Sequence, residues 1–120
     1  MAKGTGPTNE ILKSLIMKLK EVASKEKIAL WKRVAKELEQ PTRQRRSVNV
    51  YKLNKHLKDD EIGIVPGVVL SVGDYTRKNT VAAFRYTDAA QKKINKTGKA
   101  ISIEELLKKN PKGKKVRIIG

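Results

Sequence analysis

The side chains best suited to a specific chemistry lie in a run of cations at residues 41–58, which contains no acid. This basic run holds Arg43, Arg45, Arg46, Lys52, Lys55 and Lys58. Arginine carries a planar fork of donors that grips a phosphate with two hydrogen bonds and can stack on an exposed base. Lysine is a looser charge that follows a phosphate backbone. The run therefore predicts a clamp for an RNA backbone, although a solvated basic loop without a partner would have the same composition.

Two shorter basic clusters lie where the chain is expected to turn. Arg77 and Lys78 fall between two predicted strands, and Lys114 and Lys115 fall in a loop marked by Pro and Gly. Each cluster by itself is more typical of a solvated loop than of a binding site, but on so basic a chain both are candidate phosphate contacts. The spacing of three further lysines places them on the solvated side of a helix: Lys92, Lys93 and Lys96.

Side chains for catalysis or metal binding are scarce. The chain has no cysteine, which excludes disulfides, zinc knuckles, thiol nucleophiles and iron–sulfur sites. Its one histidine, His56, follows Lys55 and has no partner in the sequence, so a surface or RNA-contacting position is favoured over a general base in an RNA-cleaving enzyme. The acids at 59–61 either bind a cation or mark a turn and balance nearby lysines. We therefore predict no enzyme, no catalytic residue, no metal site, no cofactor and no small-molecule substrate.

The overall charge narrows the class of partner. Of the 120 residues, 28 are Lys or Arg and 12 are Asp or Glu, which gives a net charge of +16. So large an excess on so small a chain indicates an anionic partner. Only 4% of the residues are aromatic, which argues against a sheet of base-stacking aromatics. A DNA-binding architectural protein is the alternative, because charge does not separate the two nucleic acids, but the sequence lacks a convincing helix-turn-helix or minor-groove wedge.

The features of membrane and secreted proteins are missing from the sequence. No apolar run approaches the roughly 18 residues of a membrane span. No apolar stretch like that of a secretory signal follows Met1. We therefore expect no membrane partner and a cytoplasmic location.

Apolar spacing predicts helices in the first half of the chain. Residues 1–8 have no apolar periodicity and are expected to form a flexible tail. Apolar residues then recur at helical spacing over 9–25 and again over 28–40. Trp31 lies on the apolar side of the second helix, so it is expected in the core rather than stacked on a base.

The end of the basic run is expected to form a third, short helix. Asn49 is a candidate N-cap, with Val50, Leu53 and Leu57 facing inward. The β-branched residues Val48 and Val50 also permit a strand here.

The second half of the chain alternates between strand and helix patterns. Short strands are expected at 62–65, 68–72, 80–86, 99–101 and 116–119, with a Pro-Gly turn at 66–67 between the first two. Thr87 and Ser102 are placed to cap two intervening helices, the second with a capping box, and Gly98 is placed to end the first. The sequence thus predicts a single RNA-binding α/β domain over 9–120, in which a helical N-terminal part precedes short strands that alternate with helices.

Two adjoining segments, KELEQPTR at 36–43 and SVNVYKL at 47–53, resemble the signature of a ribosomal protein family. This is the large-subunit "eighteen-e" family of archaea and eukaryotes, which is related to the C-terminal domain of bacterial large-subunit ribosomal protein fifteen. Further matching stretches lie at 64–67, 69–70, 81–84, 98, 106–107, 110–113 and 116–119. The similarity covers nearly the whole chain, from about Thr8 to Gly120, and the compact length resembles the archaeal members.

The resemblance implies an irregular superhelix of β/α units that binds large-subunit ribosomal RNA beside neighbouring ribosomal proteins and has no enzymatic activity. It implies that RNA contacts fall on Arg43, Asn49 and Lys52, with Asn49 alternatively a structural cap. Val68 departs from the family, in which many members have a lysine after the Pro-Gly pair, so no RNA contact is expected there. Lys99 also departs, because members often have a second glycine after the position of Gly98.

Overall fold

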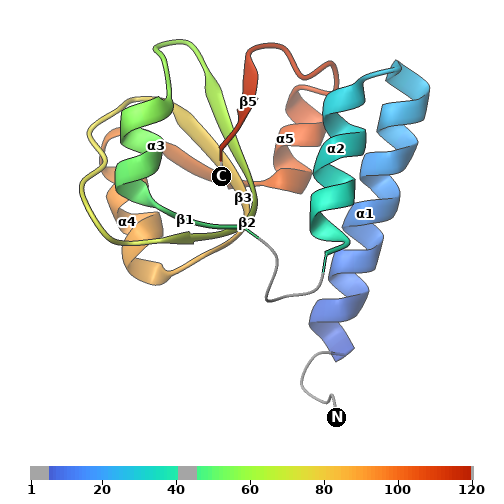
Figure 1. Cartoon of the computed structure of the whole chain (residues 1–120), viewed down its shortest axis with the longest axis horizontal. Coiled ribbons are helices and arrows are strands. Elements are labelled where there is room, and N and C mark those ends of the chain that lie inside the picture. The colour runs from blue at the N-terminus through green and yellow to red at the C-terminus, as the bar shows by residue number, and fades with distance from the viewer. Residues whose placement is uncertain (1–5, 41–45, 120) are drawn as a thin grey trace.

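The computed structural model of the protein describes the backbone of residues 6–40 and 46–119, and the side chains of residues 10–40 and 47–119. Five helices and five strands follow one another in this part of the chain (Figure 1). In order they are α1 (Gly6–Glu26), α2 (Ala29–Leu38), β1 (Arg46–Asn49), α3 (Val50–His56), β2 (Ile62–Leu70), β3 (Thr80–Tyr86), α4 (Asp88–Thr97), β4 (Lys99–Ser102), α5 (Ile103–Lys109) and β5 (Val116–Ile118). The predicted α/β class, with a helical N-terminal part before alternating strands and helices, is confirmed.

The five strands form one parallel sheet in the order β1-β2-β3-β4, with β5 also paired to β2. The first part of β2, Ile62–Ile64, pairs with β5, and its last part, Gly67–Leu70, pairs with β1. Since β3 occupies the other edge of β2, β1 and β5 lie end to end along one edge. A parallel sheet needs apolar cover on both faces, and the helices supply it.

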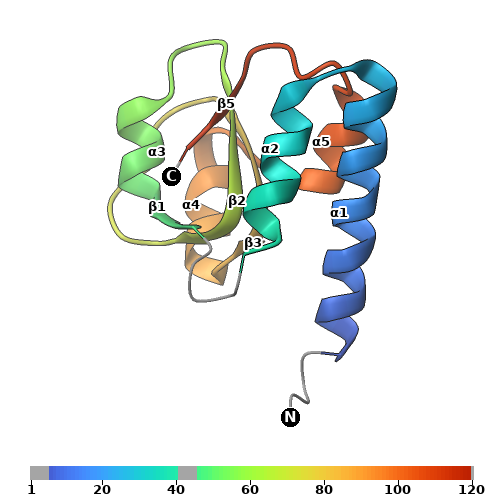
Figure 2. The ribbon, with the colours of Figure 1, turned by 45° about the vertical axis from the view of Figure 1, so that its right-hand side comes forward.

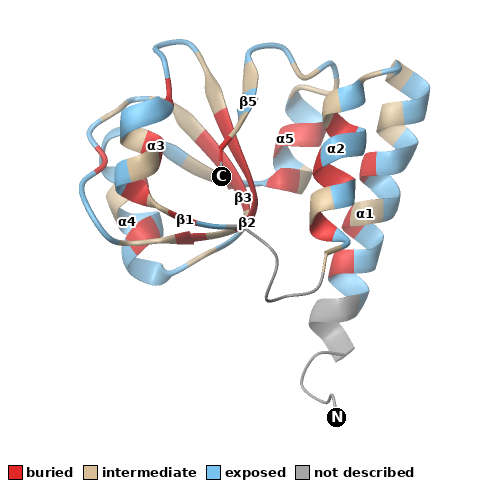
Figure 3. Ribbon diagram, in the orientation of Figure 1, coloured by how far each residue is buried: buried red, intermediate tan, exposed pale blue. Residues whose placement is uncertain are grey.

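Helices α1, α2 and α5 cover one face of the sheet, and α3 and α4 cover the other (Figures 1 and 2). Ile64 and Ala82 point into the first layer, whereas Val65, Val81 and Ala83 point into the second, as the alternation of a strand requires. The buried side chains accordingly gather on the helix faces turned to the sheet (Figure 3).

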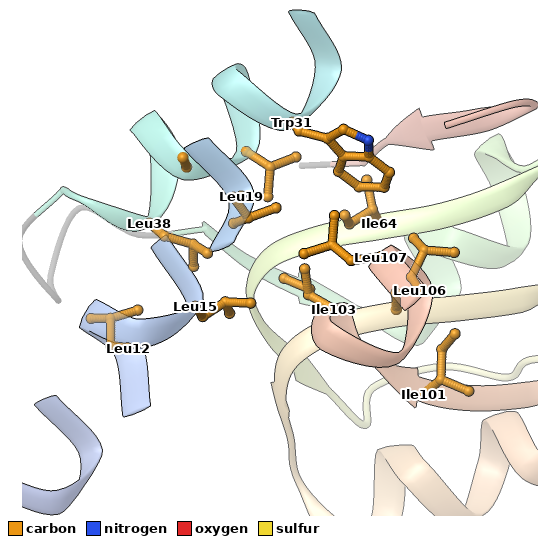
Figure 4. Packing of buried hydrophobic residues seen from close by; sticks show 13 residues of the cluster. Leu12, Leu15, Leu19, Trp31, Leu38, Ile64, Ile101, Ile103, Leu106 and Leu107 are labelled. Atoms are coloured by element: carbon orange, nitrogen blue, oxygen red, sulfur yellow. The ribbon is translucent and has the colours of Figure 1, made fainter. Parts of the chain in front are cut away.

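Trp31 lies fully buried in the first layer, among leucines of α1, α2 and α5 (Figure 4). Its indole Nε1 donates a hydrogen bond to the carbonyl oxygen of Pro111 at 2.6 Å. The predicted core position of Trp31 is confirmed, and its polar atom joins α2 to the turn after α5.

The predicted turn at Pro66-Gly67 is wrong, because β2 runs without a break from Ile62 to Leu70. Both residues are buried, and the pairing with β3 shifts between Val65 and Val68. Pro66 has no N–H to donate to the ladder, and such an irregularity accommodates it. Because β2 pairs with neighbouring strands on both edges, this segment stays extended even though its local sequence favours a turn.

Helix α1 begins at Gly6, earlier than the expected start at residue 9. Proline is tolerated in the first turn of a helix, where its missing N–H would have no intrahelical partner, so Pro7 does not delay the start. The expected tail at 1–8 thus overlaps the first turn of α1, and residues 1–5 lie outside the described part of the chain.

The end of the basic run forms both of the predicted alternatives, a strand followed by a short helix. Residues Arg46–Asn49 form β1, and Val50–His56 form α3. Asn49 occupies the expected N-cap position, but its side chain makes no capping hydrogen bond. The predicted caps of the later helices are confirmed, because Thr87 accepts a bond from the N–H of Ala90 and Ser102 forms a capping box with Glu105.

Gly98 ends α4 as expected, but for a different reason from the left-handed geometry typical of such glycines. Its φ is −122°, which any residue can adopt. A Cβ on Gly98 would lie 2.3 Å from the carbonyl oxygen of Asn79. Close approach of the loop before β3, rather than backbone conformation, therefore requires glycine here.

Candidate nucleic-acid interface

The short helix α3 carries the lysines that end the basic run. Val50 and Leu53 are fully buried on its inner side, and the same spacing exposes Lys55 and leaves Lys52 half-buried. Because α3 covers the sheet face opposite α1 and α2, these lysines lie on the far side of the sheet from the helical hairpin (Figure 1). The predicted inward residues of this helix are confirmed.

The loop between β2 and β3, residues 71–79, is anchored to α3 through Asn54. The Asn54 side-chain oxygen accepts from the N–H of Thr76 at 2.8 Å, and its backbone oxygen accepts from Nε of Arg77 at 2.6 Å. Lys78, next to Arg77, is exposed. The structure therefore brings this predicted basic cluster beside α3, and it gives the guanidinium of Arg77 a structural contact as well as a charge. We call α3 and loop 71–79 together the α3 surface.

Asn49 links the start of α3 to the same loop. Its Oδ1 accepts a hydrogen bond from the N–H of Val72 at 3.2 Å, and the N–H of Tyr51 donates to the carbonyl oxygen of Val72, also at 3.2 Å. Asn49 is half-buried. Its amide oxygen thus has a partner within the protein, which supports the structural alternative left open for this residue.

Lys93, on α4, is a third anchor of loop 71–79. Its ammonium donates to the carbonyl oxygens of Ser71 and Gly73, each at 2.7 Å. Sequence reasoning placed Lys93 with Lys92 and Lys96 on the solvated side of α4. That prediction is wrong for Lys93, because the periodicity of α4 carries no information about a loop that comes from earlier in the chain.

A buried tyrosine closes the far end of the loop. The hydroxyl of Tyr75 donates to the carbonyl oxygen of Asn79 at 2.9 Å. Burial raises the pKa of this phenol to about 12, and the nearby Arg77 guanidinium opposes the rise only in part. Burial likewise raises the pKa of Tyr86 well above its usual range. Both tyrosines therefore stay neutral and act as hydrogen-bond donors at neutral pH.

The acids at 59–61 lie beside three basic side chains from two other segments, loop 71–79 and the chain around β5. Their distances of 3.4–3.9 Å are those of ion pairs at a solvated surface. The pairs are Asp59 with Arg77, Asp60 with Lys115, and Glu61 with Arg117. Of the two interpretations of this triplet, the structure supports the one in which it balances nearby cations.

The cluster at 114–115 lies in the turn between α5 and β5. Asn110 holds the backbone of Lys114 through both its amide oxygen and its amide nitrogen, and the Lys114 side chain is exposed. Lys115 has a φ of +58°, and its carbonyl oxygen accepts from the N–H of Ile62. The exposed Lys115 ammonium lies 3.9 Å from the carboxylate of Asp60, just before β2.

The arginines of the basic run are only partly described. Arg43 and Arg45 lie outside the described residues, as does the side chain of Arg46. The backbone of Arg46 begins β1 opposite Gly67 of β2, and β1 leads directly into α3. The described part of the run, from Arg46 on, therefore leads through β1 into α3.

The described residues form neither a metal site nor a membrane span. No group of three or more His, Asp or Glu side chains there could hold a metal ion. His56 is exposed. No described helix is long and apolar enough to cross a membrane.

Comparison with known proteins identifies the family. A family model described as "Ribosomal protein 60S L18 and 50S L18e" matches residues 2–120. The chain belongs to this ribosomal protein family. This is the eighteen-e family that the signature segments resemble, so the predicted family is confirmed.

Archaeal relatives share the full length of the chain. The large ribosomal subunit protein eL18 of Sulfurisphaera tokodaii is 41% identical over 120 residues, which cover 99% of this chain and 98% of the relative. The eL18 of Methanothermobacter thermautotrophicus is 37% identical over 120 residues, with 99% of each chain covered. That of Haloarcula marismortui is 39% identical over 112 residues, or 93% of this chain and 97% of the relative.

Family membership decides several predictions at once. The chain is a protein of the large ribosomal subunit, of the archaeal type, and it is not an enzyme. Its place is with the ribosome in the cytoplasm. The comparisons give no support to the alternative of a DNA-binding architectural protein.

Proposed function

We propose that this chain binds large-subunit ribosomal RNA through its α3 surface, the arginines that precede it and the lysines of the turn at 114–115, and that it contacts neighbouring ribosomal proteins elsewhere. The observation that carries the proposal is the outward side of α3. It carries the half-buried Lys52 and the exposed Lys55, it follows the arginines of the basic run through β1, and Asn54 anchors it to the loop that carries Lys78. The domain over 9–120 would act as one RNA-binding body.

The mechanism is electrostatic. Lysine and arginine side chains neutralise phosphates and release condensed counterions, while the folded body fixes where those charges can reach. The proposed contacts are Arg43, Arg45, Arg46, Asn49, Lys52, Lys55, Arg77, Lys78, Lys114 and Lys115. Among them, Asn49 and Arg77 also hold loop 71–79 in place, so their removal would affect binding partly through the loop.

The acids at 59–61, beside this surface, are paired with cations. The triplet at 59–61 faces Arg77, Lys115 and Arg117. Pairing of this kind lowers the repulsion that carboxylates would exert on an approaching phosphate. Repulsion from these three acids at the lysines of α3 is therefore reduced.

The test is a double variant, Lys52→Ala with Lys55→Ala, assayed for binding to protein-free archaeal large-subunit ribosomal RNA over a range of salt concentrations. Loss of two phosphate contacts should weaken binding and reduce the slope of log affinity against log salt by about 1.5. The matched control is Lys32→Ala with Lys36→Ala, two exposed lysines on α2, on the opposite side of the sheet. Equal losses in the two double variants would show that only total charge matters and would refute binding through the α3 surface.

A further inference from the structure

Two residues with exposed apolar side chains are joined through their backbone at the start of α3. Tyr51 is 53% exposed and Val72 is 62% exposed, and the N–H of Tyr51 donates to the carbonyl oxygen of Val72. The other large exposed apolar residues among those described, Ile11 and Met17, lie on α1 across the sheet. Single exposed apolar residues are common on protein surfaces, so the argument depends on how this pair is held and what surrounds it.

The backbone around Tyr51 is tightly constrained. Gly73 packs so closely that a Cβ on it would lie 2.4 Å from the Cβ of Tyr51, and its φ is +93°. Asn49 holds the N–H of Val72, and Lys93 holds the carbonyl oxygen of Gly73. The base of the tyrosine side chain is therefore fixed before any partner binds, which lowers the entropy lost on binding.

Lysines from α3 and α4 lie near this tyrosine. Lys55 lies one helical turn after Tyr51, on the same side of α3, and Lys52 follows it directly. The ammonium of Lys93 contacts the carbonyl oxygens of Ser71 and Gly73 in the adjoining loop, and Asp74 is the acid next along that loop. An exposed aromatic ring among lysines suits a partner that is both anionic and aromatic, which is a nucleic acid with an unpaired base.

We propose that Tyr51 stacks on an unpaired base of the ribosomal RNA, while Lys52 and Lys55 contact the phosphates beside that base. The proposal rests on the proposed function, because it requires the α3 surface to face RNA. The low aromatic content of the chain argues against a β-sheet on which several aromatic side chains stack on bases. A single tyrosine on a helix would instead stack on one base.

The experiment uses the full chain and protein-free archaeal large-subunit ribosomal RNA. Tyr51→Leu and Tyr51→Gln remove the ring but keep a residue that helices accept, and Tyr51→Phe keeps the ring without its hydroxyl. We expect both non-aromatic variants to bind about 5- to 100-fold more weakly with an unchanged salt slope, since stacking adds no charge. Tyr51→Phe should bind like the wild type. Met17→Ala, at an exposed apolar residue of α1, is the control and should also bind like the wild type.

Four outcomes would overturn the stacking proposal. Wild-type affinity of Tyr51→Leu, with the Lys52 and Lys55 double variant impaired, would leave the proposed function standing and exclude the stack. Normal RNA binding by Tyr51→Leu but poor incorporation into the large subunit would assign Tyr51 to a protein neighbour instead. Loss of affinity in Tyr51→Phe equal to that in Tyr51→Leu would assign the effect to the hydroxyl. If the lysine variant also binds normally, the proposed function fails, and the stack fails with it.

Discussion

The side-chain oxygen of Asn49 accepts a hydrogen bond from the backbone N–H of Val72 at 3.2 Å. Asn49 is the last residue of β1, and Val72 lies just after β2, so the bond joins the carboxyl ends of two neighbouring parallel strands. The first turn of α3 begins at the same point, and Tyr51 donates to the carbonyl oxygen of Val72. Asn49, together with Asn54, therefore holds loop 71–79 against the helix that we propose binds RNA.

Asn49→Ala should lower the free energy of unfolding by about 1 kcal/mol, the net value of one hydrogen bond. Asn49 makes no capping bond to α3, so the loss would come from the loop rather than from the helix. Urea denaturation measures the change, and faster amide exchange at Val72 would locate it. Asn49→Asp keeps an acceptor oxygen and should retain most of the stability. Wild-type stability in the alanine variant would mean that the bond to Val72 contributes nothing.

Lys93→Met should loosen loop 71–79 while leaving the rest of the fold intact. The variant keeps an apolar side chain of similar length but removes the donor to the carbonyl oxygens of Ser71 and Gly73. Because Lys93 is partly exposed and water can replace it, we expect a loss of about 1 kcal/mol. Amide exchange in the loop is the direct measurement. Lys92→Met, an exposed neighbour on the same helix, is the control, and equal effects of the two variants would contradict the anchoring role of Lys93.

Gly98→Ala should be strongly destabilising. The added Cβ would lie 2.3 Å from the carbonyl oxygen of Asn79, which belongs to backbone and cannot move without displacing the start of β3. We expect a loss of about 3 kcal/mol, at the upper end for overpacking. Gly63→Ala is a matched control in the same sheet, because its nearest neighbour is the flexible end of Leu57 at 3.1 Å, so it should cost about 1 kcal/mol. Thermal denaturation of both variants tests the difference.

Stability should fall as the pH rises from about 10 to 12, partly because of Tyr75. Tyrosines in the unfolded chain lose their protons near pH 10, whereas the folded protein holds the pKa of Tyr75 at about 12. The unfolded state therefore binds fewer protons in this range, and stability decreases by up to about 1.4 kcal/mol per pH unit for one such group.

Tyr75→Phe isolates this effect. The variant lacks the bond to Asn79, so it should be less stable at neutral pH, but it has no proton to lose at this position. Its stability should fall less steeply between pH 10 and 12 than that of the wild type, and since both chains contain the same lysines, the difference in slope belongs to Tyr75. Equal slopes would show that Tyr75 ionises alike in the folded and unfolded chains.

Much of the fold could be predicted from local patterns. Helical spacing of apolar residues placed α1 and α2, and the cap residues Thr87 and Ser102 placed the starts of α4 and α5. These signals are local, because a helix satisfies its backbone within itself and needs only one apolar side. The turn predicted at Pro66-Gly67 is wrong because that signal, too, is purely local. Strands β1 and β3 pair with β2 on either side of it and keep the chain extended.

The candidate site was predicted in part. The inward spacing of Val50 and Leu53 was enough to turn Lys55 outward, and that much follows from the sequence of α3 alone. The structural contact of Lys93 was missed, because it depends on a loop that reaches α4 from between two strands. The sequence does not single out Tyr51, because only the packed structure shows that it is exposed and that Gly73 fixes its backbone.

The sequence by itself determined the net charge of +16, the helix faces and the family of this protein, because these depend on composition, short-range periodicity and similarity along the chain. The tertiary structure decided which charged side chains have partners within the protein. It paired the acids at 59–61 with Arg77, Lys115 and Arg117, and it turned the ammonium of Lys93 onto backbone oxygens. The physical reason is distance: ion pairs and hydrogen bonds act over a few ångströms, and only folding brings segments so far apart in the chain that close together.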